Sequence, residues 1–171
     1  MFNIGDLVVY SSHGICRISD ICEKTFLETT ETYYVLHPME AINQLSISIP
    51  VDNEKVTMLA LIEEDEAHDL LESFKEPGVK WIDNPHQRVQ RYSNIVDSAN
   101  RLEIAKVVNT LMRNELELKR ADKKVHDRDH RLLYSIQKIL FKEMAISLGT
   151  TMEDINNRVL DIIKTSEKVS M

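Results

Sequence analysis

Six histidines and a run of four acidic residues are the side chains in this sequence that could serve metal binding or acid–base chemistry. His126 and His130 are four residues apart, a spacing that can place two imidazoles on one face of a helix. They lie in a polar stretch without an HExxH motif or a Cys/His pair, so a solvated helix start is favoured over a zinc site. The acidic run at 63–66 suits the first turn of a helix, where the macrodipole favours negative charge. We predict no metal site, no cofactor and no catalytic centre.

Motifs for nucleophilic catalysis and for phosphate binding are missing from the sequence. It has no GxSxG, Walker or GxGxxG motif, and its four glycines leave little material for a loop that cradles phosphates. We therefore expect a protein that binds a macromolecular partner, without a small-molecule substrate, rather than an enzyme.

Two cysteines, Cys16 and Cys22, lie six residues apart in a region with strand character, and no CxxC motif accompanies them. They either point to the same face of a strand or are separated by a bend. We expect buried free thiols rather than a disulfide or a metal pair.

The single tryptophan, Trp81, precedes a segment that carries Arg88, Arg91 and Tyr92. An aromatic side chain beside several guanidinium groups can stack on bases or enter a minor groove while the arginines hold phosphates. In the alternative, Trp81 packs a linker onto neighbouring helices and the arginines are solvated. The residues alone favour packing and leave DNA contact open.

The first sixty residues have the pattern of short β-strands, because β-branched and aromatic residues cluster between turn signals. The expected strands cover residues 7–10, 15–21, 32–37, 45–51 and 56–61, and Ser-Ser-His-Gly at 11–14 is typical of a turn. Five short antiparallel strands in so little chain favour a small barrel, which closes its own sheet edges.

After residue 61 the apolar residues recur with helical spacing. A short helix is expected over residues 63–74, and its predicted inner side carries Ala67, Leu70, Leu71 and Phe74. Glu-Pro-Gly at 76–78 breaks this pattern and predicts a domain boundary after residue 76.

Residues 77–171 predict a compact bundle of four helices. Asn84 followed by Pro85 begins the first helix, which should reach about residue 98, and the second covers about 101–119. Asp127 is expected to cap the third helix, Gly149 to end it, and Thr151 to cap the last. The prediction is thus an α+β protein of two domains, a β-barrel with a short helix over 1–76 and a helical bundle over 77–171.

Charge is distributed unevenly along the chain, which has a net charge of −7. Residues 1–79 carry four basic and fifteen acidic residues, a net charge of −11, whereas residues 80–171 carry seventeen basic and thirteen acidic residues, a net charge of +4. This asymmetry suggests a protein partner for the acidic half and a polyanion for the basic half, unless it is chance variation of the surface.

The sequence contains no apolar run long enough to span a membrane, and its first ten residues do not have the pattern of a signal peptide. We therefore expect a cytoplasmic protein without a membrane partner.

The opening sequence FNIGDLVVY, followed by His-Gly-Ile at 13–15, resembles the start of the CarD family, a Gly-Asp-x-Val-Val-Tyr strand and a His-Gly turn. The similarity continues through Tyr-Tyr-Val-Leu at 33–36 and Ile-Pro-Val at 49–51, and it returns at 102–112 and 131–149. It therefore covers nearly the whole chain, with a short insertion around residues 37–43.

This resemblance implies a Tudor-like or SH3-like barrel that binds the β subunit of bacterial RNA polymerase. It also implies a helical domain that contacts promoter DNA near the upstream edge of the melted region, so that the protein modulates open-complex stability. Autonomous DNA binding should be weak because the net charge is negative, and polymerase would then recruit the protein.

Polymerase-contacting positions of the family fall on three residues of this chain. Lys24 and Phe26 match a basic residue at the end of the second strand and an apolar residue two positions further on. A further basic position of the family is occupied by Ser48, so one polymerase contact is weakened or replaced here.

The DNA-contacting positions of the family match less evenly. Arg91 and Tyr92 match an Arg-Tyr pair, but Trp81 lies eleven residues before Tyr92, whereas the DNA-reading tryptophan of the family lies only a few residues before it. Lys80 and Arg88 are the further candidates for phosphate contacts.

Two other hypotheses remain open at this point. The chain could bind polymerase or another protein without touching DNA, with the helical half serving to dimerise or to bind a second protein. It could also be an enzyme, which would require an enclosed polar pocket with strongly shifted carboxylates or histidines.

Overall fold

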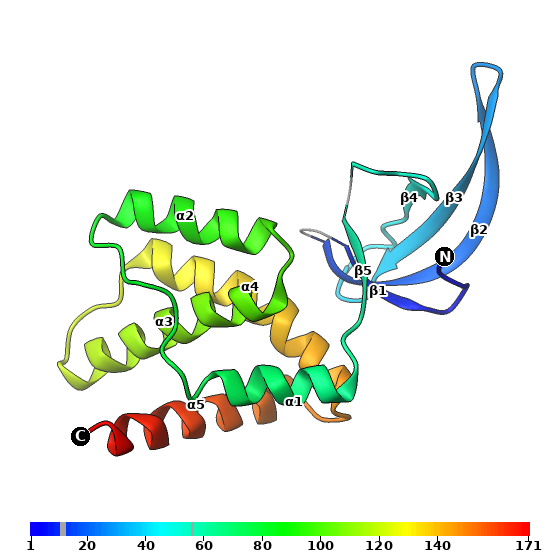
Figure 1. Cartoon of the computed structure of the whole chain (residues 1–171). Coiled ribbons are helices and arrows are strands. Elements are labelled where there is room, and N and C mark those ends of the chain that lie inside the picture. Colours follow the sequence, from blue (N-terminus) through cyan, green and yellow to red (C-terminus); the bar gives the residue numbers. More distant parts are fainter. Residues whose placement is uncertain (11–12, 56) are drawn as a thin grey trace. The chain divides into compact units, whose positions relative to one another are not determined.

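A computed structural model describes residues 1–10, 13–55 and 57–171, and it divides the chain into two compact units, Met1–Leu61 and Ile62–Met171 (Figure 1). Ser11 and Ser12 of the expected turn, and Val56 at the start of the last expected strand, lie outside the described residues. A sheet followed by helices confirms the predicted α+β class.

The first unit contains an antiparallel sheet of five strands among its described residues. The strands are β1 (Leu7–Tyr10), β2 (Gly14–Phe26), β3 (Thr29–Pro38), β4 (Ile47–Pro50) and β5 (Met58–Ala60). Their order is β4-β3-β2-β1-β5, so β4 and β5 lie at the two edges. Among the described residues, the edge strands β4 and β5 do not pair with each other. Backbone hydrogen bonds therefore do not close the sheet into a barrel, and its two edges stay open.

The hairpin of β2 and β3 is longer than the sequence indicated, and Figure 1 shows it as a ribbon that extends beyond the other strands. Its pairing continues to Phe26 opposite Thr29, whereas β4 pairs only with residues 33–36 of β3. Leu27 and Glu28 form the turn with φ values of 44° and 71°. Two central residues with positive φ are the geometry of a type I′ turn, which matches the twist of the strands.

A β-bulge between Ile18 and Asp20 lets β2 keep apolar side chains on the core side of the sheet. Ile18 lies opposite Leu36 and Ile21 opposite Tyr34, so these inward positions are three residues apart along β2 instead of the usual two. The buried core of this unit consists of Val8, Cys16, Ile18, Tyr34, Leu36 and Ile49.

The bulge also separates the two free cysteines. Cys16 is buried in the core, and burial raises the pKa of its thiol. Cys22 lies beyond the bulge, is half-buried, and pairs with Tyr33 on the other face of the sheet. The sequence allowed the two cysteines either to share one face of a strand or to be separated by a bend. In the structure, the bulge separates them.

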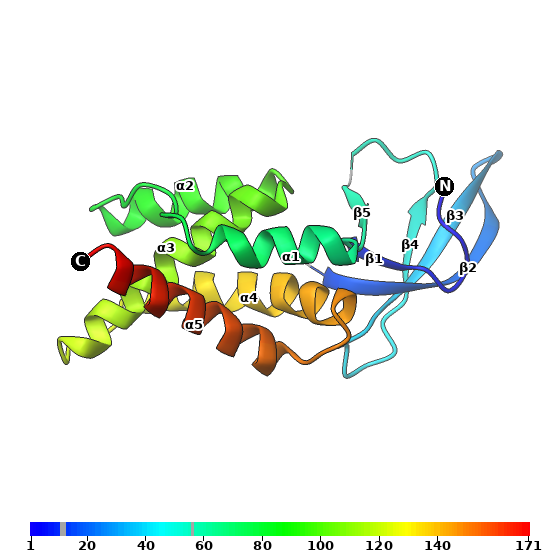
Figure 2. The same cartoon turned by 60° about the horizontal axis from the view of Figure 1, so that its bottom comes forward.

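Residues 62–171, all of which are described, form five α-helices, the short one expected over residues 63–74 and the four expected after residue 77. They are α1 (Glu64–Ser73), α2 (Pro85–Asp97), α3 (Arg101–Arg120), α4 (Asp127–Ser147) and α5 (Met152–Val169). Helices α3 and α4 pack together at the centre, with α2 on one side of them and α1 and α5 on the other (Figures 1 and 2).

Helix α1 belongs to the helical unit, although the sequence grouped it with the strands. Its predicted inner residues are buried in the same core as α3, α4 and α5, and Phe74 meets Phe141 of α4 edge to face with ring centroids 6.5 Å apart. The units therefore divide after Leu61, not after residue 76. Glu-Pro-Gly at 76–78 follows the end of α1 inside this unit.

Most of the predicted helix ends are present. The side chains of Asn84 and Thr151 accept hydrogen bonds from the backbone N–H groups of Gln87 and Asp154 at 3.0 and 3.1 Å. Asp127 does not occupy the N-cap position of α4, because His126 does, and Asp127 begins the helix instead.

Candidate functional site

Four side chains gather on one face of the sheet, where the β2–β3 hairpin meets β4; we call this surface the hairpin face, and it consists of Lys24, Phe26, Tyr33 and Ser48. Residues directly opposite each other, and residues two apart on one strand, lie on the same face of a sheet. Tyr33 lies opposite Cys22, and Ser48 lies opposite Val35. The register thus brings together all three residues that the sequence proposed as polymerase contacts.

Direct contacts link the members of the hairpin face. The Lys24 ammonium donates a hydrogen bond to the Ser48 hydroxyl at 2.6 Å and lies 5.7 Å from the centroid of the Tyr33 ring. Phe26 packs edge-on against the same ring, with centroids 6.2 Å apart, yet it is 61% exposed. These contacts hold the Lys24 ammonium in position, and the exposed ring of Phe26 lies on the same face.

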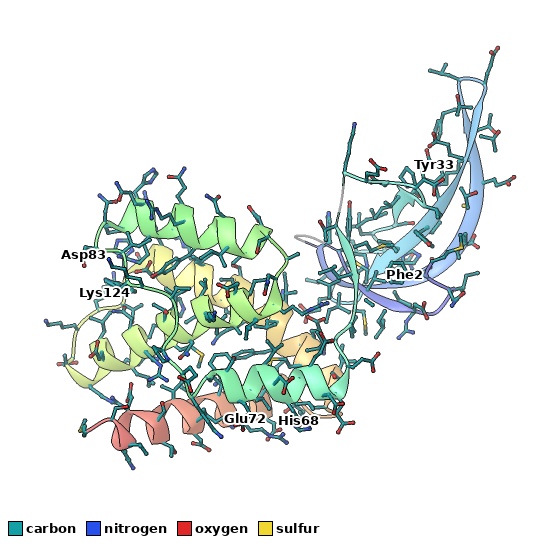
Figure 3. The ribbon with its side chains drawn as sticks, viewed as in Figure 1. Phe2, Tyr33, His68, Glu72, Asp83 and Lys124 are labelled. Carbon is teal, nitrogen blue, oxygen red and sulfur yellow. The ribbon has the colours of Figure 1, made fainter. Side chains whose placement is uncertain are left out.

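Tyr33 is the member of this group that sequence reasoning missed as a site residue (Figure 3). Its hydroxyl donates to the Glu31 carboxylate at 3.3 Å, and partial desolvation together with this carboxylate raises the pKa of Tyr33. The pairing of Tyr33 with Cys22 puts it on this face, but the strand expected from the sequence ended at residue 21 and did not include Cys22.

The turn at the end of the hairpin adds an exposed apolar side chain, because Leu27 is 99% exposed. A leucine with positive φ is unusual, since such turns favour Asn-Gly. Together with Phe26, Leu27 gives the end of the hairpin two adjacent exposed apolar side chains, a patch that can contact another protein.

The second candidate region surrounds Trp81 at the start of α2. The Arg88 guanidinium stacks on the Trp81 ring, with Cζ 4.1 Å from its centroid. Its Nε and Nη2 donate to the two carboxylate oxygens of Asp129 at 2.9 and 2.5 Å, and its Nη1 donates to the carbonyl of Ile82 at 2.7 Å. Arg88 is only 3% exposed, so its side chain fastens the segment before α2 to α4.

Tyr92 belongs to the same internal assembly. It is 1% exposed and donates its hydroxyl hydrogen to the carbonyl of Lys80 at 2.8 Å. Desolvation raises the pKa of this hydroxyl, with a smaller contribution from Asp129. Arg88 and Tyr92 are nearly inaccessible in this geometry, which argues against the DNA contacts expected of them.

Lys80 and Arg91 remain exposed near this assembly, and Trp81 is half-buried against the core. Because Arg88 binds Asp129 in the first turn of α4, the connection from α3 to α4 lies at the same end of the unit. Figure 3 places Asp83 and Lys124 at this end.

This connection and the first turn of α4 carry exposed basic side chains that sequence reasoning did not select: Lys123, Lys124 and Arg128. The signal for them was the dense run of Lys and Arg at 119–131. We call Lys80, Arg91 and these three residues the basic end of the helical unit.

Other titratable groups serve the fold. His130, half of the i, i+4 pair, lies 2.8 Å from the Glu115 carboxylate. Glu143 is buried between the Ile62 backbone N–H at 3.0 Å and the Arg101 guanidinium. In the part of the chain that the structure describes, no three His, Cys, Asp or Glu residues are grouped to hold a metal ion.

Comparisons with known proteins agree with this architecture unit by unit. The family model of the CarD-like/TRCF RID domain matches residues 2–62, and that of the CarD C-terminal domain matches residues 69–160. YdeB of Bacillus subtilis (strain 168), whose name describes it as a candidate transcription factor, is 28% identical over 162 residues, covering 92% of this chain and 99% of that protein.

A sheet unit and a helical unit that match the two CarD domains in order define a transcription-associated factor that interacts with RNA polymerase. The chain belongs to the CarD family. Members of this family are generally not enzymes. Among the described residues, no helix has both the length and the apolar character needed to cross a membrane.

Proposed function

We propose that this protein regulates transcription by binding the β subunit of RNA polymerase through its sheet unit and promoter DNA through its helical unit. Bound in this way, it changes the stability of the open complex. The observation that carries the proposal is the hairpin face, where the candidate polymerase contacts of a CarD-family chain form one connected surface.

Polymerase binding rests on the chemistry of the hairpin face. Phe26 supplies an exposed apolar ring, and Lys24 supplies a cation whose direction is fixed by Ser48 and Tyr33. A rigid aromatic anchor beside an oriented charge is typical of the few residues that carry most of the affinity of an interface. Strand β4 lies at a sheet edge beside this face and can pair with an extended segment of the polymerase.

Binding of the full-length protein to purified β subunit tests this contact. We expect the Lys24→Glu/Phe26→Ala variant to bind at least tenfold more weakly than the wild type, because it loses both anchor residues. The control is Ile4→Ala/Lys55→Glu, which makes the same change in charge and also truncates an apolar residue exposed in the same unit. Equal affinity of the two double variants would remove the hairpin face from the proposal.

DNA binding rests on the basic end of the helical unit. Its five exposed cations, Lys80, Arg91, Lys123, Lys124 and Arg128, can neutralise phosphates, and half-buried Trp81 lies beside them. The net charge of −7 favours contact only once polymerase has placed the protein near the promoter. Minor-groove insertion by Trp81 would require the ring to leave Arg88, so we assign phosphate contact as the main interaction.

Footprinting of a promoter–polymerase complex tests the DNA contact. The Lys80→Ala/Arg91→Ala variant should lose the upstream protection that the wild type adds, because two phosphate contacts are removed. Lys164→Ala/Lys168→Ala on α5 removes the same charge at exposed positions and should leave the protection intact.

A second candidate function is a polymerase-binding protein that does not contact DNA. The burial of Arg88 and Tyr92 favours it, because two of the five proposed DNA residues serve the fold. Footprints that are identical for the wild type and Lys80→Ala/Arg91→Ala, with polymerase binding intact, would select this alternative.

A further inference from the structure

Helix α2 carries a row of amide side chains on the face that it turns away from the core. Its inner face, which contains buried Arg88 and Tyr92, packs on α3 and α4 (Figures 1 and 2). On the other side of the helix, Gln87, Gln90 and Asn94 are exposed. Residues three or four positions apart are neighbours on a helix surface, so these three side chains form one row along the axis. We call them the amide row.

The fold does not use the side chains of the amide row. Asn84 shows the contrast, because its side-chain oxygen caps α2 by accepting a hydrogen bond from the backbone N–H of Gln87. Among the described residues, no hydrogen bond of the protein involves the side-chain amides of Gln87, Gln90 or Asn94. Each of them therefore offers a carbonyl acceptor and an amino donor side by side to a partner.

The backbone under the amide row is held firmly from the inner face. Arg88 is bound to the carboxylate of Asp129 in α4, and the Tyr92 hydroxyl donates to the carbonyl of Lys80. Both anchors lie within the segment of α2 that carries the row. The amides are thus presented at a fixed spacing, which recognition of a regular partner requires.

Charge around the amide row suits a polyanion. Between Pro85 and Asn94, the exposed side chains of α2 carry no negative charge, and Arg91 carries a positive one. The acidic residues nearest in sequence are Asp83, before the helix, and Asp97, its last residue. Arg91 also belongs to the basic end, so the amide row continues the surface to which phosphate contact is assigned.

We propose that the amide row of Gln87, Gln90 and Asn94 reads adenines in the major groove of promoter DNA. The inference rests on the proposed function, because polymerase and the basic end must first place α2 on the duplex. The side-chain carbonyl of Asn or Gln accepts from the N6 amino group of adenine, and its amino group donates to N7. Both adenine groups lie on the major-groove edge of the base pair.

The dimensions of the amide row match this groove. The major groove admits an α-helix, whereas the minor groove, about 6 Å wide, does not. From the rise of 1.5 Å per residue, the row is about 10 Å long, which equals about three base-pair steps of 3.4 Å. The row therefore covers about three neighbouring base pairs, and the cations beside it meet the phosphates that border the groove.

Promoters with a randomised upstream segment test the base preference. Polymerase complexes are isolated with and without the full-length protein, and their DNA is sequenced. We expect the wild type to enrich adenine about tenfold at two or three neighbouring positions relative to polymerase alone. Gln90→Ala/Asn94→Ala should lose this enrichment but keep the upstream protection, because Lys80 and Arg91 remain. Gln44→Ala/Asn157→Ala, which removes one exposed Gln and one exposed Asn elsewhere, should enrich adenine as the wild type does.

Replacing adenine by 7-deazaadenine at the enriched positions separates the major groove from DNA shape. This base lacks the N7 acceptor but keeps its minor-groove edge and its phosphate. The concentration of wild-type protein that gives half-maximal upstream protection should rise about tenfold, whereas that of Gln90→Ala/Asn94→Ala should not change.

The outcomes separate this inference from the proposed function. Upstream protection without a base preference, or a preference that Gln90→Ala/Asn94→Ala retains, would overturn the inference and leave the proposed function standing. Weaker binding of this variant to polymerase, with no change in base preference, would assign the amide row to a protein contact instead. No upstream protection by the wild type would overturn both.

Discussion

Arg88 and Arg91 lie three residues apart on α2, yet only Arg88 is buried. Arg88 is buried because a carboxylate 41 residues further along the chain, Asp129, binds it in two hydrogen bonds. Arg91 lies on the exposed surface of the same helix. The burial of an arginine on this helix depends on tertiary contacts with distant residues. The local spacing of residues in the sequence does not predict such contacts.

Arg88→Ala should lower the free energy of unfolding by about 3–5 kcal/mol, because it leaves the Asp129 carboxylate buried without its partner. Arg91→Ala should change it by no more than about 0.5 kcal/mol, as an exposed substitution away from the core does. Urea denaturation of both variants measures the difference. Similar stability of the two would contradict a structural role for Arg88.

Glu143 is the buried carboxyl group whose titration should affect stability. Desolvation raises its pKa above the ordinary value of 4.5, and the charge and hydrogen bonds of Arg101 offset only part of this effect. The folded protein therefore holds the Glu143 proton more tightly than the unfolded chain does. The stabilisation from this proton is fully present below the unfolded pKa and is lost as the pH rises through the raised folded pKa.

The Glu143→Gln variant lacks this titration. We expect the unfolding free energy of the wild type, relative to Glu143→Gln, to fall as the pH is raised above about 4.5 and to level off once Glu143 is ionised. Urea denaturation between pH 4 and pH 8 gives this difference directly. A difference that grows with pH would mean that Arg101 outweighs the cost of burial.

At the scale of elements, strand and helix positions were predictable where apolar periodicity was strong. The sequence placed β1 and the four later helices within a few residues of their ends. It missed the outer half of the β2–β3 hairpin, because those strands carry polar residues and the Leu27–Glu28 turn lacks an Asn-Gly signal. That half contains Lys24 and Phe26, so their connection to Tyr33 required the structure.

The segment between α1 and α2 is fastened to α3 by side chains of that helix. Asn109 and Thr110 donate hydrogen bonds to the carbonyls of Glu76 and Val79 at 2.7 and 2.9 Å. Gly78 lies between these contacts, and a Cβ atom added there would lie 2.1 Å from the Thr110 hydroxyl and 2.5 Å from the backbone oxygen of Lys106. The Lys106 oxygen belongs to the backbone of α3 and cannot move away without distorting the helix. The close approach of residue 78 to α3 therefore requires glycine.

Gly78→Ala should therefore destabilise the protein by about 2–3 kcal/mol through overpacking against α3. Glu76→Ala, an exposed change two residues away, should alter stability by no more than about 0.5 kcal/mol. Thermal unfolding of the two variants compares them. A Gly78→Ala protein as stable as Glu76→Ala would show that the segment shifts freely.

At the scale of the whole molecule, the sequence predicted two units but placed the boundary at a turn signal. The Pro-Gly pair at 77–78 suggested a linker, whereas burial of α1 against α3, α4 and α5 places the division after Leu61. An amphipathic helix shows that it has a buried face, but not which neighbour covers that face.

Fragments of the chain test this boundary. Residues 62–171 contain the complete helical core and should unfold cooperatively, whereas residues 77–171 lack α1 and should be much less stable because Leu70, Leu71 and Phe74 no longer cover the core. Circular dichroism during urea denaturation measures both. Equal stability of the fragments would support the boundary at 76.

The lifetime of a promoter open complex tests the central claim most directly, because it requires both interfaces. With RNA polymerase and a heparin challenge, the wild-type protein should change this lifetime, whereas Lys24→Glu/Phe26→Ala and Lys80→Ala/Arg91→Ala should each lose most of the change. The matched variants Ile4→Ala/Lys55→Glu and Lys164→Ala/Lys168→Ala should behave as the wild type. An unchanged lifetime with the wild type, or a change that both interface variants retain, would contradict the account.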